Sequence, residues 1–270
     1  MLFGAPLDLT ESFRTGTATA PDRIRTASDV LETYSPVLRL DLDDHPLVDW
    51  GDLDFTDASM SEALEAVGTT VALARTVALP IMLGGEHTAS YGAVQTLATL
   101  YPSLTIVHVD AHTDLRDRYS DTPFSHATVM RRIGDLVGLG RIAQYGIRSG
   151  TRDEFELSRQ CLYSGPDIVM SRAVRDRIHT RPVYLTIDID VLDPASAPGT
   201  GCPEPGGCSF ADLLAFLYSL RGLNVIGVDV MEVCPAVDVN DITSVAAAKL
   251  VREAALLFGS RQAATLVERS

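Results

Sequence analysis

Short apolar runs alternate with longer amphipathic stretches along most of the chain. Six of these runs are rich in β-branched and other apolar residues and predict buried strands: 79–83, 104–109, 141–147, 167–170, 183–189 and 223–230. Several runs place apolar residues at consecutive positions, which is typical of strands that are covered on both faces. The pattern therefore predicts a sheet with little exposed surface.

Helical spacing of apolar residues appears between and after these runs. The stretches with this spacing are 57–78, 210–220 and 242–258. Ser209 is a candidate N-cap, with Asp212 three positions later, and Asp241 is a candidate cap for the last stretch. Strands that alternate with helices predict an α/β fold, with a mainly parallel sheet between two layers of helices. No repeat or linker interrupts the chain, so residues 1–270 are expected to form a single domain.

Composition narrows the classes of function. The 270 residues include 46% hydrophobic ones and carry a net charge of −14, with a pI of about 4.7. An acidic chain argues against a nucleic-acid partner and is compatible with a small cationic substrate. No apolar window approaches the length of a membrane span, and no basic residue precedes Arg14 as a secretory signal requires. The four cysteines form no C-x-x-C pair, so we expect a cytoplasmic protein with free thiols.

Carboxylates and imidazoles follow two of the predicted strands. Asp110, His112 and Asp114 succeed the run 104–109 at every second position, and Asp188 and Asp190 end the run 183–189 in the same way. Because side chains alternate along a strand, each set can point to one side. Such acids either lie apart in solvent, as we expect for the acidic stretch 41–54, or are neutralised by cations.

Metal is the better explanation where the acids extend apolar strands. Carboxylates with imidazoles and no thiolate suit manganese, magnesium or iron better than structural zinc. A third segment, Gly84-Gly85-Glu86-His87, ends another predicted strand and supplies a further imidazole. This tetrapeptide is a weak signal when it is taken alone.

Together the segments resemble the ureohydrolases, the arginase and agmatinase family, and look most like agmatinases. The segments that carry the resemblance are "GGEH" at 84–87, "DAHTD" at 110–114, "DIDVLDPASAPGTGCPEPGG" at 188–207 and "DVMEVCPAVD" at 229–238, with "FRTGTATAPDRIR" near the N-terminus. The resemblance covers nearly the whole chain. It implies the three-layer arginase/deacetylase-like fold, a mainly parallel sheet between helices.

The resemblance also implies a binuclear site with two Mn²⁺ ions per chain. His87 and Asp114 would complete one ion, His112 and Asp190 the other, and Asp110 and Asp188 would bridge both. Four carboxylates offset the charge of two divalent ions, and a shared hydroxide leaves about one net negative charge, which suits a guanidinium group. Paired metals would activate the water that attacks the guanidinium carbon.

Two further residues match catalytic positions of the family. His126 corresponds to the histidine proposed as a proton shuttle, although Ala127 stands where the family usually has glycine. Glu232 corresponds to the carboxylate that holds the guanidinium group. We expect His108 and Glu86 to lie near the site without binding metal. Asp193 should organise the turn at Pro194, and Cys202 should serve packing.

The expected activity is hydrolysis of a guanidino compound to urea and an amine, with agmatine as the leading substrate. Arginine, guanidinobutyrate, guanidinopropionate and formiminoglutamate remain alternatives within the same chemistry. A mononuclear zinc deacetylase would need fewer acids, and a non-catalytic homologue would be expected to lose ligands. Arg116 and Arg118 could read a substrate carboxylate if they face inward. The resemblance also implies a homo-oligomer, a trimer or hexamer.

Overall fold

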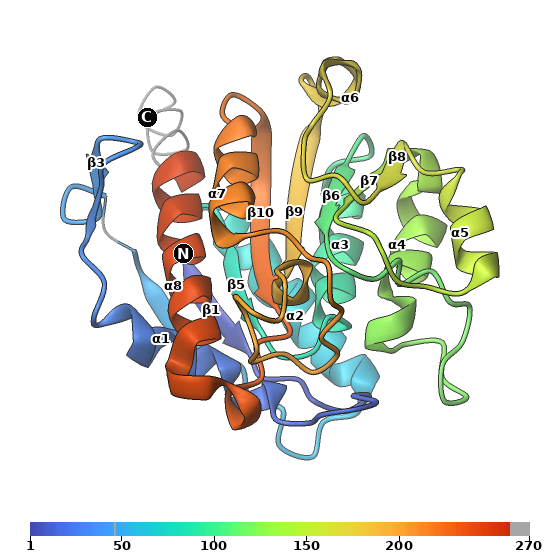
Figure 1. Ribbon diagram of the computed structural model, residues 1–270, viewed down its shortest axis with the longest axis horizontal. Helices are drawn as coiled ribbons and strands as arrows, with labels where there is room; N and C mark the ends of the chain where they lie inside the picture. The colour runs from blue at the N-terminus through green and yellow to red at the C-terminus, as the bar shows by residue number, and fades with distance from the viewer. Residues whose placement is uncertain (46, 260–270) are drawn as a thin grey trace.

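An eight-stranded sheet crosses the molecule in this computed structural model, which describes residues 1–45 and 47–259 (Figure 1). Its order is β4-β1-β5-β10-β9-β6-β7-β8, and each neighbouring pair is parallel. The strands are β1 (Leu2–Ala5), β4 (Asp49–Asp52), β5 (Ile81–Gly84), β6 (Thr105–Val109), β7 (Ile142–Tyr145), β8 (Tyr163–Gly165), β9 (Pro182–Asp188) and β10 (Asn224–Met231). Two short strands, β2 (Tyr34–Ser35) and β3 (Leu40–Asp41), form a separate antiparallel pair.

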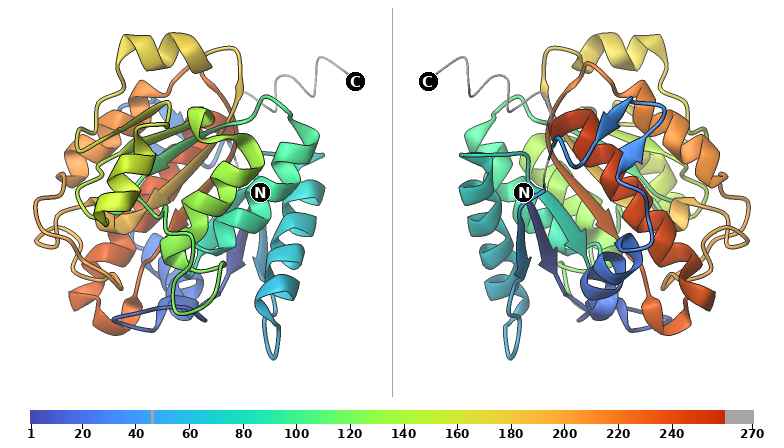
Figure 2. Two further views of the ribbon diagram at one scale, coloured as in Figure 1. Left: turned by 90° about the vertical axis from the view of Figure 1, so that its right-hand side faces the viewer. Right: turned by 90° about the vertical axis from the view of Figure 1, so that its left-hand side faces the viewer.

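Helices cover both faces of this sheet, as the side views in Figure 2 show. One layer contains α1 (Ala20–Ser28), α6 (Arg172–Ile178), α7 (Phe210–Ser219) and α8 (Ile242–Ala254), and the other contains α2 (Met60–Arg75), α3 (Ala89–Leu100), α4 (Val129–Val137) and α5 (Arg152–Ser158). Short 3-10 turns lie at 17–19, 126–128, 139–141, 189–191, 235–237 and 239–241, and a π-helical turn at 255–259 follows α8. None of the described helices has the length and apolarity that a bilayer crossing requires. The predicted three-layer α/β fold is confirmed.

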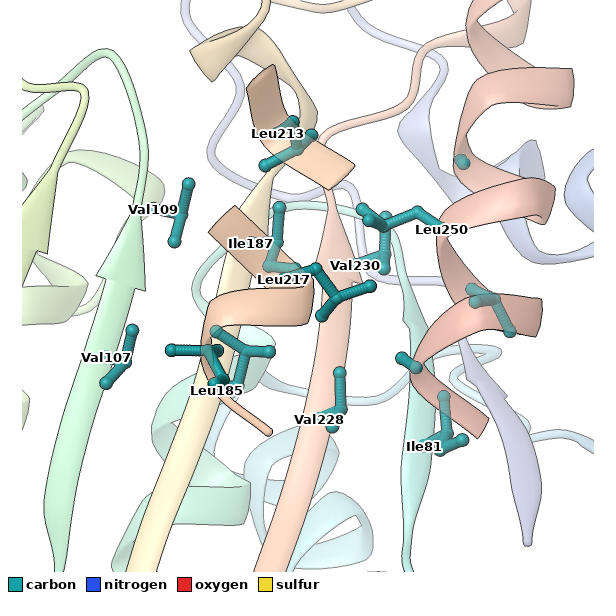
Figure 3. Close-up of a cluster of buried hydrophobic side chains, with 14 of the residues drawn as sticks. Ile81, Val107, Val109, Leu185, Ile187, Leu213, Leu217, Val228, Val230 and Leu250 are labelled. Atoms are coloured by element: carbon teal, nitrogen blue, oxygen red, sulfur yellow. The ribbon is translucent and has the colours of Figure 1, made fainter. Parts of the chain in front are cut away.

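Each face of the sheet has its own apolar core. Alternate residues of β6, β9 and β10 meet helices α7 and α8, and Figure 3 shows this cluster with Val107, Val109, Leu185, Ile187, Val228, Val230, Leu213, Leu217 and Leu250 among its labelled members. Intervening residues such as Ile106 and Ile226 point to the opposite face, where they pack with Val67 of α2 and Leu97 of α3. Burial on both faces explains why these strands read as continuous apolar runs.

Five of the six predicted strands coincide with observed strands, and the prediction for 167–170 is wrong. The observed strand there is β8, which pairs with β7 and ends just before Pro166. Proline has no N–H to donate to a ladder, so the pairing stops at that residue. The apolar residues beyond it, including Ile168 and Met170, pack against the core without forming a strand.

The expectation of a surface loop at 41–54 is wrong for its last part. Residues 49–52 form β4, which pairs with β1 at the edge of the sheet. All four residues of β4 are exposed, so no apolar alternation marks the strand in the sequence. Strand β1 itself was also absent from the predicted set.

The helix caps are predicted correctly in one case and wrongly in the other. Ser209 accepts a hydrogen bond from the backbone N–H of Asp212, whose carboxylate in turn accepts from the backbone N–H of Ser209. Asp241 does not cap α8, because its backbone is left-handed at φ 58° and its carboxylate pairs with Arg23 at 2.6 Å. Asp238 accepts instead from the first N–H groups of that helix, those of residues 243 and 244, at 3.0 and 2.8 Å.

Candidate metal centre and substrate pocket

The predicted site residues meet at the carboxyl ends of the central strands. The helices that follow β5 and β6 lie on one face of the sheet and those that follow β9 and β10 lie on the other, so the connecting loops diverge where β5 neighbours β10 and where β9 neighbours β6. Ligand sites of parallel α/β sheets form at such switch points. His87 follows β5, Asp110 follows β6, Asp188 ends β9 and Glu232 follows β10.

His87 stands at the centre of the acid cluster. Its Nδ1 lies 3.2 Å from Asp110 Oδ2, 3.2 Å from Asp188 Oδ2 and 3.6 Å from Asp114 Oδ2. Its Nε2 lies 2.8 Å from the Thr186 hydroxyl on β9, which fixes the ring with Nδ1 toward the carboxylates. His87 and the three acids are buried, so solvent does not screen their charges.

A second group forms around His112 and shares one acid with the first. His112 Nδ1 lies 2.8 Å from Asp190 Oδ2 and 3.6 Å from Asp110 Oδ1. Asp110 therefore offers one oxygen to each imidazole, which is the placement expected of a bridging ligand. The six predicted ligands, His87, Asp110, His112, Asp114, Asp188 and Asp190, lie together in one cluster.

The short loops after the strands hold the acids in fixed directions. Asp188 accepts a hydrogen bond from the backbone N–H of Asp190 at 2.8 Å, and Asp110 accepts from that of His112 in the same way. Asp114 has a left-handed backbone at φ 52°, a conformation that costs energy for residues other than glycine. His108 contacts Asp110 through Nε2 at 2.8 Å, and its Nδ1 lies 3.1 Å from the side-chain amide of Gln144; His108 is close enough to His87, Asp110 and Asp114 to share an ion, but both of its ring nitrogens already have protein partners.

The electrostatics of the cluster favour a cation. Burial, together with the charges of Asp190 and Asp110, raises the pKa of Asp188 well above its usual range. Burial and the charge of Asp110 raise the pKa of Asp114 in the same way. Although burial opposes protonation of His87, its hydrogen bonds to Asp110 and Asp188 raise the pKa of that imidazole. Without a metal ion, protons neutralise part of the charge of these carboxylates. A divalent ion would neutralise the same charge in their place.

A cavity of about 260 Å³ opens over this cluster. Its walls include His87, His112, Asp114, Asp188, Asp190, His126, Glu232, Ser12, Arg116, Tyr119, Glu154 and Cys202. Polar groups of the cluster thus form its floor, and loops that follow β1, β6 and β7 form its rim. The volume suits a small molecule of a few heavy atoms rather than a polymer.

His126 and Glu232 both reach this cavity. Burial, with the nearby charges of His112 and His87, lowers the pKa of His126 to about 4. Glu232 accepts a hydrogen bond from the backbone N–H of His87 at 2.6 Å, and its own backbone is left-handed at φ 66°. Burial and the charges of Glu11 and Asp188 raise the pKa of Glu232 well above its usual range.

Three residues of the loop after β1 also reach the site, although the sequence does not predict them. Thr10 and Ser12 contact the two ring nitrogens of His126 at 3.2 and 3.4 Å. Glu11 lies beside Glu232, and both of its carboxylate oxygens are buried with no N–H or hydroxyl partner among the described residues, so the two carboxyl groups can only share a proton. Burial and the charges of Glu86 and Asp8 raise the pKa of Glu11 to about 7, although its hydrogen bond with Glu232 lowers that pKa. The only available signal was a cluster of polar residues after an unrecognised strand.

Asp193 organises its turn as expected, whereas Cys202, which was expected to serve packing, lines the cavity instead. Asp193 accepts backbone N–H groups of residues 195 and 206 at 3.0 and 2.8 Å and so organises its loop. Cys202 lies 3.6 Å from the Ser12 hydroxyl, and burial raises the pKa of its thiol. A protonated thiol is a poor metal ligand, although Cys202, Glu11 and His126 are close enough to share an ion.

The Arg116 side chain lines the cavity, whereas that of Arg118 does not. The Arg116 Nε lies 3.4 Å from Glu154 Oε2, and its guanidinium lies over the Tyr119 ring at 5.1 Å. Arg118 donates to the backbone carbonyl of Asp121 at the surface. Glu154 is buried and also accepts the Thr113 hydroxyl at 2.8 Å, so it offsets the charge of Arg116 at the rim.

Fold and site together define an α/β protein whose sheet carries a cluster able to bind metal at its carboxyl edge. Comparison with known proteins assigns the family. Residues 1–257 match the Arginase family. The chain is 41% identical to an agmatinase of Bacillus anthracis over 94% of this chain and 89% of that protein. It is 32% identical to a guanidinobutyrase of Pseudomonas aeruginosa over 93% and 83%.

A solved structure agrees with these sequence relatives. The agmatine ureohydrolase of Thermoplasma volcanium superposes with a TM-score of 0.84 and 36% identity, covering 95% of this chain and 88% of that one. The chain belongs to the arginase family.

Proposed function

We propose that this protein is a manganese-dependent amidinohydrolase that converts agmatine and water into putrescine and urea. The observation that carries the proposal is the meeting of three carboxylates within 3.2–3.6 Å of one ring nitrogen of His87, in a buried site at the base of a small cavity. The similarity to agmatinases over nearly the whole chain favours agmatine among the guanidino compounds.

The six clustered residues would hold two ions. His87 and Asp114 complete one site, His112 and Asp190 complete the other, and Asp110 and Asp188 serve both. Oxygen and imidazole ligands with no ionised thiolate suit manganese. When bound, two such ions supply an activated water and Lewis acidity for hydrolysis of the guanidino group.

Two carboxylates would receive the guanidinium group. Glu232 lies on the cavity wall, and Glu11 lies next to it with both oxygens buried and the Glu232 carboxyl as their hydrogen-bond partner. A planar guanidinium can donate several N–H groups to carboxylates. Its positive charge also offsets the repulsion between two adjacent acids, which must otherwise share a proton. The cavity therefore favours a cation at the position where Glu11 and Glu232 meet.

His126 would supply the proton that the departing amine requires. It lines the same cavity as the metal cluster, and its two ring nitrogens face the hydroxyl groups of Thr10 and Ser12. Its lowered pKa keeps the ring neutral in the free enzyme, so that it takes up and passes on a proton during turnover rather than repelling the cationic substrate. Burial and the neighbouring charges thus prepare His126 for this role.

A second candidate substrate is 4-guanidinobutyrate. Arg116 faces the cavity and could pair with a carboxylate at the far end of the substrate, and a guanidinobutyrase is among the relatives. Glu154 already pairs with Arg116, however, and would instead attract the terminal amine of agmatine. This balance of charges at the rim makes agmatine the preferred substrate.

We also propose a cytoplasmic homo-oligomer, a trimer or hexamer. Four free cysteines suit a reducing compartment, and oligomerisation is implied by the resemblance to ureohydrolases. Light scattering of the purified protein gives the number of subunits directly.

The test is urea release from agmatine, arginine and 4-guanidinobutyrate at one manganese concentration and one pH. We expect the highest kcat/KM for agmatine. A preference for guanidinobutyrate would assign the rim to carboxylate recognition by Arg116, and a preference for arginine would refute the agmatinase assignment. Absence of urea with all three compounds would refute the proposed chemistry.

A further inference from the structure

The side chain of Thr10 connects His126 to a buried carboxylate. The Thr10 hydroxyl oxygen lies 3.2 Å from His126 Nδ1 and 2.8 Å from Glu86 Oε1. The same oxygen accepts the backbone N–H of His126 at 3.2 Å. Thr10 belongs to the loop after β1, Glu86 follows β5 and His126 begins the turn before α4, so three distant segments converge on one hydroxyl group.

Glu86 is committed to this loop. Its side chain is fully buried, and Oε2 accepts the backbone N–H groups of Leu9 and Thr10, both at 2.6 Å. Its other oxygen accepts the Thr10 hydroxyl. Glu86 therefore fixes both the backbone and the side chain of Thr10, and each of its oxygens accepts from the β1 loop.

Counting donors and acceptors settles the direction of each hydrogen bond. A hydroxyl group has one proton and two lone pairs. An ionised carboxylate only accepts, so the Thr10 proton points to Glu86 and the two lone pairs receive the backbone N–H and Nδ1 of His126. Nδ1 must then carry a proton. The other nitrogen, Nε2, keeps its lone pair and lies 3.4 Å from the Ser12 hydroxyl.

We propose that Thr10, held by Glu86, fixes neutral His126 in the tautomer with the proton on Nδ1, so that Nε2 is the nitrogen that exchanges protons with the substrate. This inference rests on the proposed role of His126 in urea release. Neutral Nε2 first takes the proton that the attacking water gives up; during collapse the carbon–nitrogen bond breaks, its electron pair goes to the departing nitrogen, and that nitrogen takes the same proton from Nε2 of the imidazolium. His126 returns to the neutral tautomer that Thr10 stabilises. Thr10 is thus a positioning residue.

The principal test compares Thr10→Val with Thr10→Ser in the manganese enzyme. Valine matches threonine in shape but removes the hydroxyl, whereas serine keeps it. We expect Thr10→Val to lower kcat about 10–100-fold, the range typical of partners that orient a functional histidine, with little change in KM. Thr10→Ser should retain most of the activity. Thr70→Val, on helix α2 away from the cavity, is the matched control.

The tautomer itself can be observed apart from activity. In protein labelled with ¹⁵N-histidine and loaded with diamagnetic Mg²⁺, the ring nitrogens of His126 should show a protonated Nδ1 and an unprotonated Nε2 near neutral pH. Thr10→Ser should keep this pattern, and Thr10→Val should give a mixture. The assignment of the resonance comes from its absence in His126→Ala.

The outcomes separate this inference from the proposed function. A protonated Nε2 in the parent protein, or equal kcat for the parent and Thr10→Val, would overturn the role of Thr10 even if agmatine is hydrolysed. Failure to release urea would refute the proposed function, while the ring nitrogens would still report the tautomer. If Thr10→Val folds poorly, Glu86→Gln provides a second variant. The glutamine amide can donate to the Thr10 hydroxyl, which can then donate its own proton to Nδ1, so that the Nδ1-protonated tautomer is no longer required.

Discussion

The loops after β6 and β9 and the loop after β1, residues 6–16, serve the same cavity in different ways. The first two deliver Asp110, Asp114 and Asp188 to one face at the ends of buried strands. The β1 loop delivers hydroxyl groups and a carboxylate to His126 and Glu232. In the proposed mechanism, the first region gathers the negative charge that binds metal ions, and the β1 loop sets the positions of protons and of the substrate cation.

This difference explains the kind of residue that each region uses. A metal centre needs several charged ligands on one spot, and the strand period of two places them there with little extra structure. Control of a proton requires only one hydroxyl or carboxylate at hydrogen-bond distance. The β1 loop can therefore act through Thr10, Glu11 and Ser12 without a repeating motif, and the two regions should respond differently to substitution.

The largest expected effect is on metal binding. Asp110→Asn should lose both ions, because Asp110 reaches both imidazoles, whereas Asp190→Asn should retain one ion under the same conditions. Urea release by Asp110→Asn should fall by more than ~100-fold, which is the upper end of the loss that follows removal of a hydrogen-bond partner of a metal ligand. Metal analysis after dialysis measures the content, and the exposed Asp135→Asn on α4 is the control. Equal metal content in the Asp110 and Asp190 variants would contradict a bridging role.

Substitution of His126 should separate metal binding from turnover. We expect His126→Ala to keep both ions and to lose about 10²–10⁴-fold in kcat, the usual value of general acid–base help. His179→Ala, at the exposed end of α6, is a control with the same change of side chain. If kcat of His126→Ala equals that of the parent across pH 7–9, the histidine has no role in proton transfer.

Substitution of Glu11 should act on substrate binding and on its pH dependence. With a raised pKa, Glu11 is protonated below about pH 7 and ionised above it, so cation binding and kcat/KM should rise with pH through this range. Bound metal ions move the step to lower pH. Glu11→Gln should lower kcat/KM for agmatine about tenfold above the step and flatten the profile, since hydrogen bonds to charged groups are worth ~1.5–3 kcal/mol.

The exposed Glu65→Gln on α2 provides the control for this change of charge. A profile of Glu11→Gln that keeps the same step and the same KM as the parent would show that Glu11 does not meet the guanidinium. Metal content should stay at the parent value in both variants.

The smallest expected effect is at the rim of the cavity. Arg116→Ala should change kcat/KM for agmatine less than about threefold, because exposed ion pairs contribute little, and should lower it further for 4-guanidinobutyrate. Arg118→Ala, whose side chain does not line the cavity, is the matched control. An increase of guanidinobutyrate turnover in Arg116→Ala would exclude carboxylate recognition by this arginine.

The sequence was sufficient for the central sheet and for the cluster of acids, for a common reason. Strands β6, β9 and β10 are buried on both faces, so their apolar runs are continuous and the acids that end them stand out. Edge strands lack this signal. β4 is exposed at all four residues. The strand predicted at 167–170 is observed instead at 163–165, before Pro166.

The β1 loop could not be predicted because its contacts are distant in sequence. Thr10 meets Glu86 and His126 across 76 and 116 positions, and nothing in the local pattern identifies either partner. Asp241 failed as a helix cap for a similar reason, since its carboxylate pairs with the remote Arg23. Local periodicity indicates which residues end a strand, whereas the choice of hydrogen-bond partner depends on the folded structure.

The most direct test of the account is urea release from agmatine during stepwise addition of manganese to the metal-free protein. The proposal of a binuclear site predicts little activity at one equivalent per chain, full activity at two, and loss of activity on chelation. Urea formation that is complete at one equivalent, or that persists after chelation has removed the metal, would contradict the binuclear amidinohydrolase proposed for this member of the arginase family.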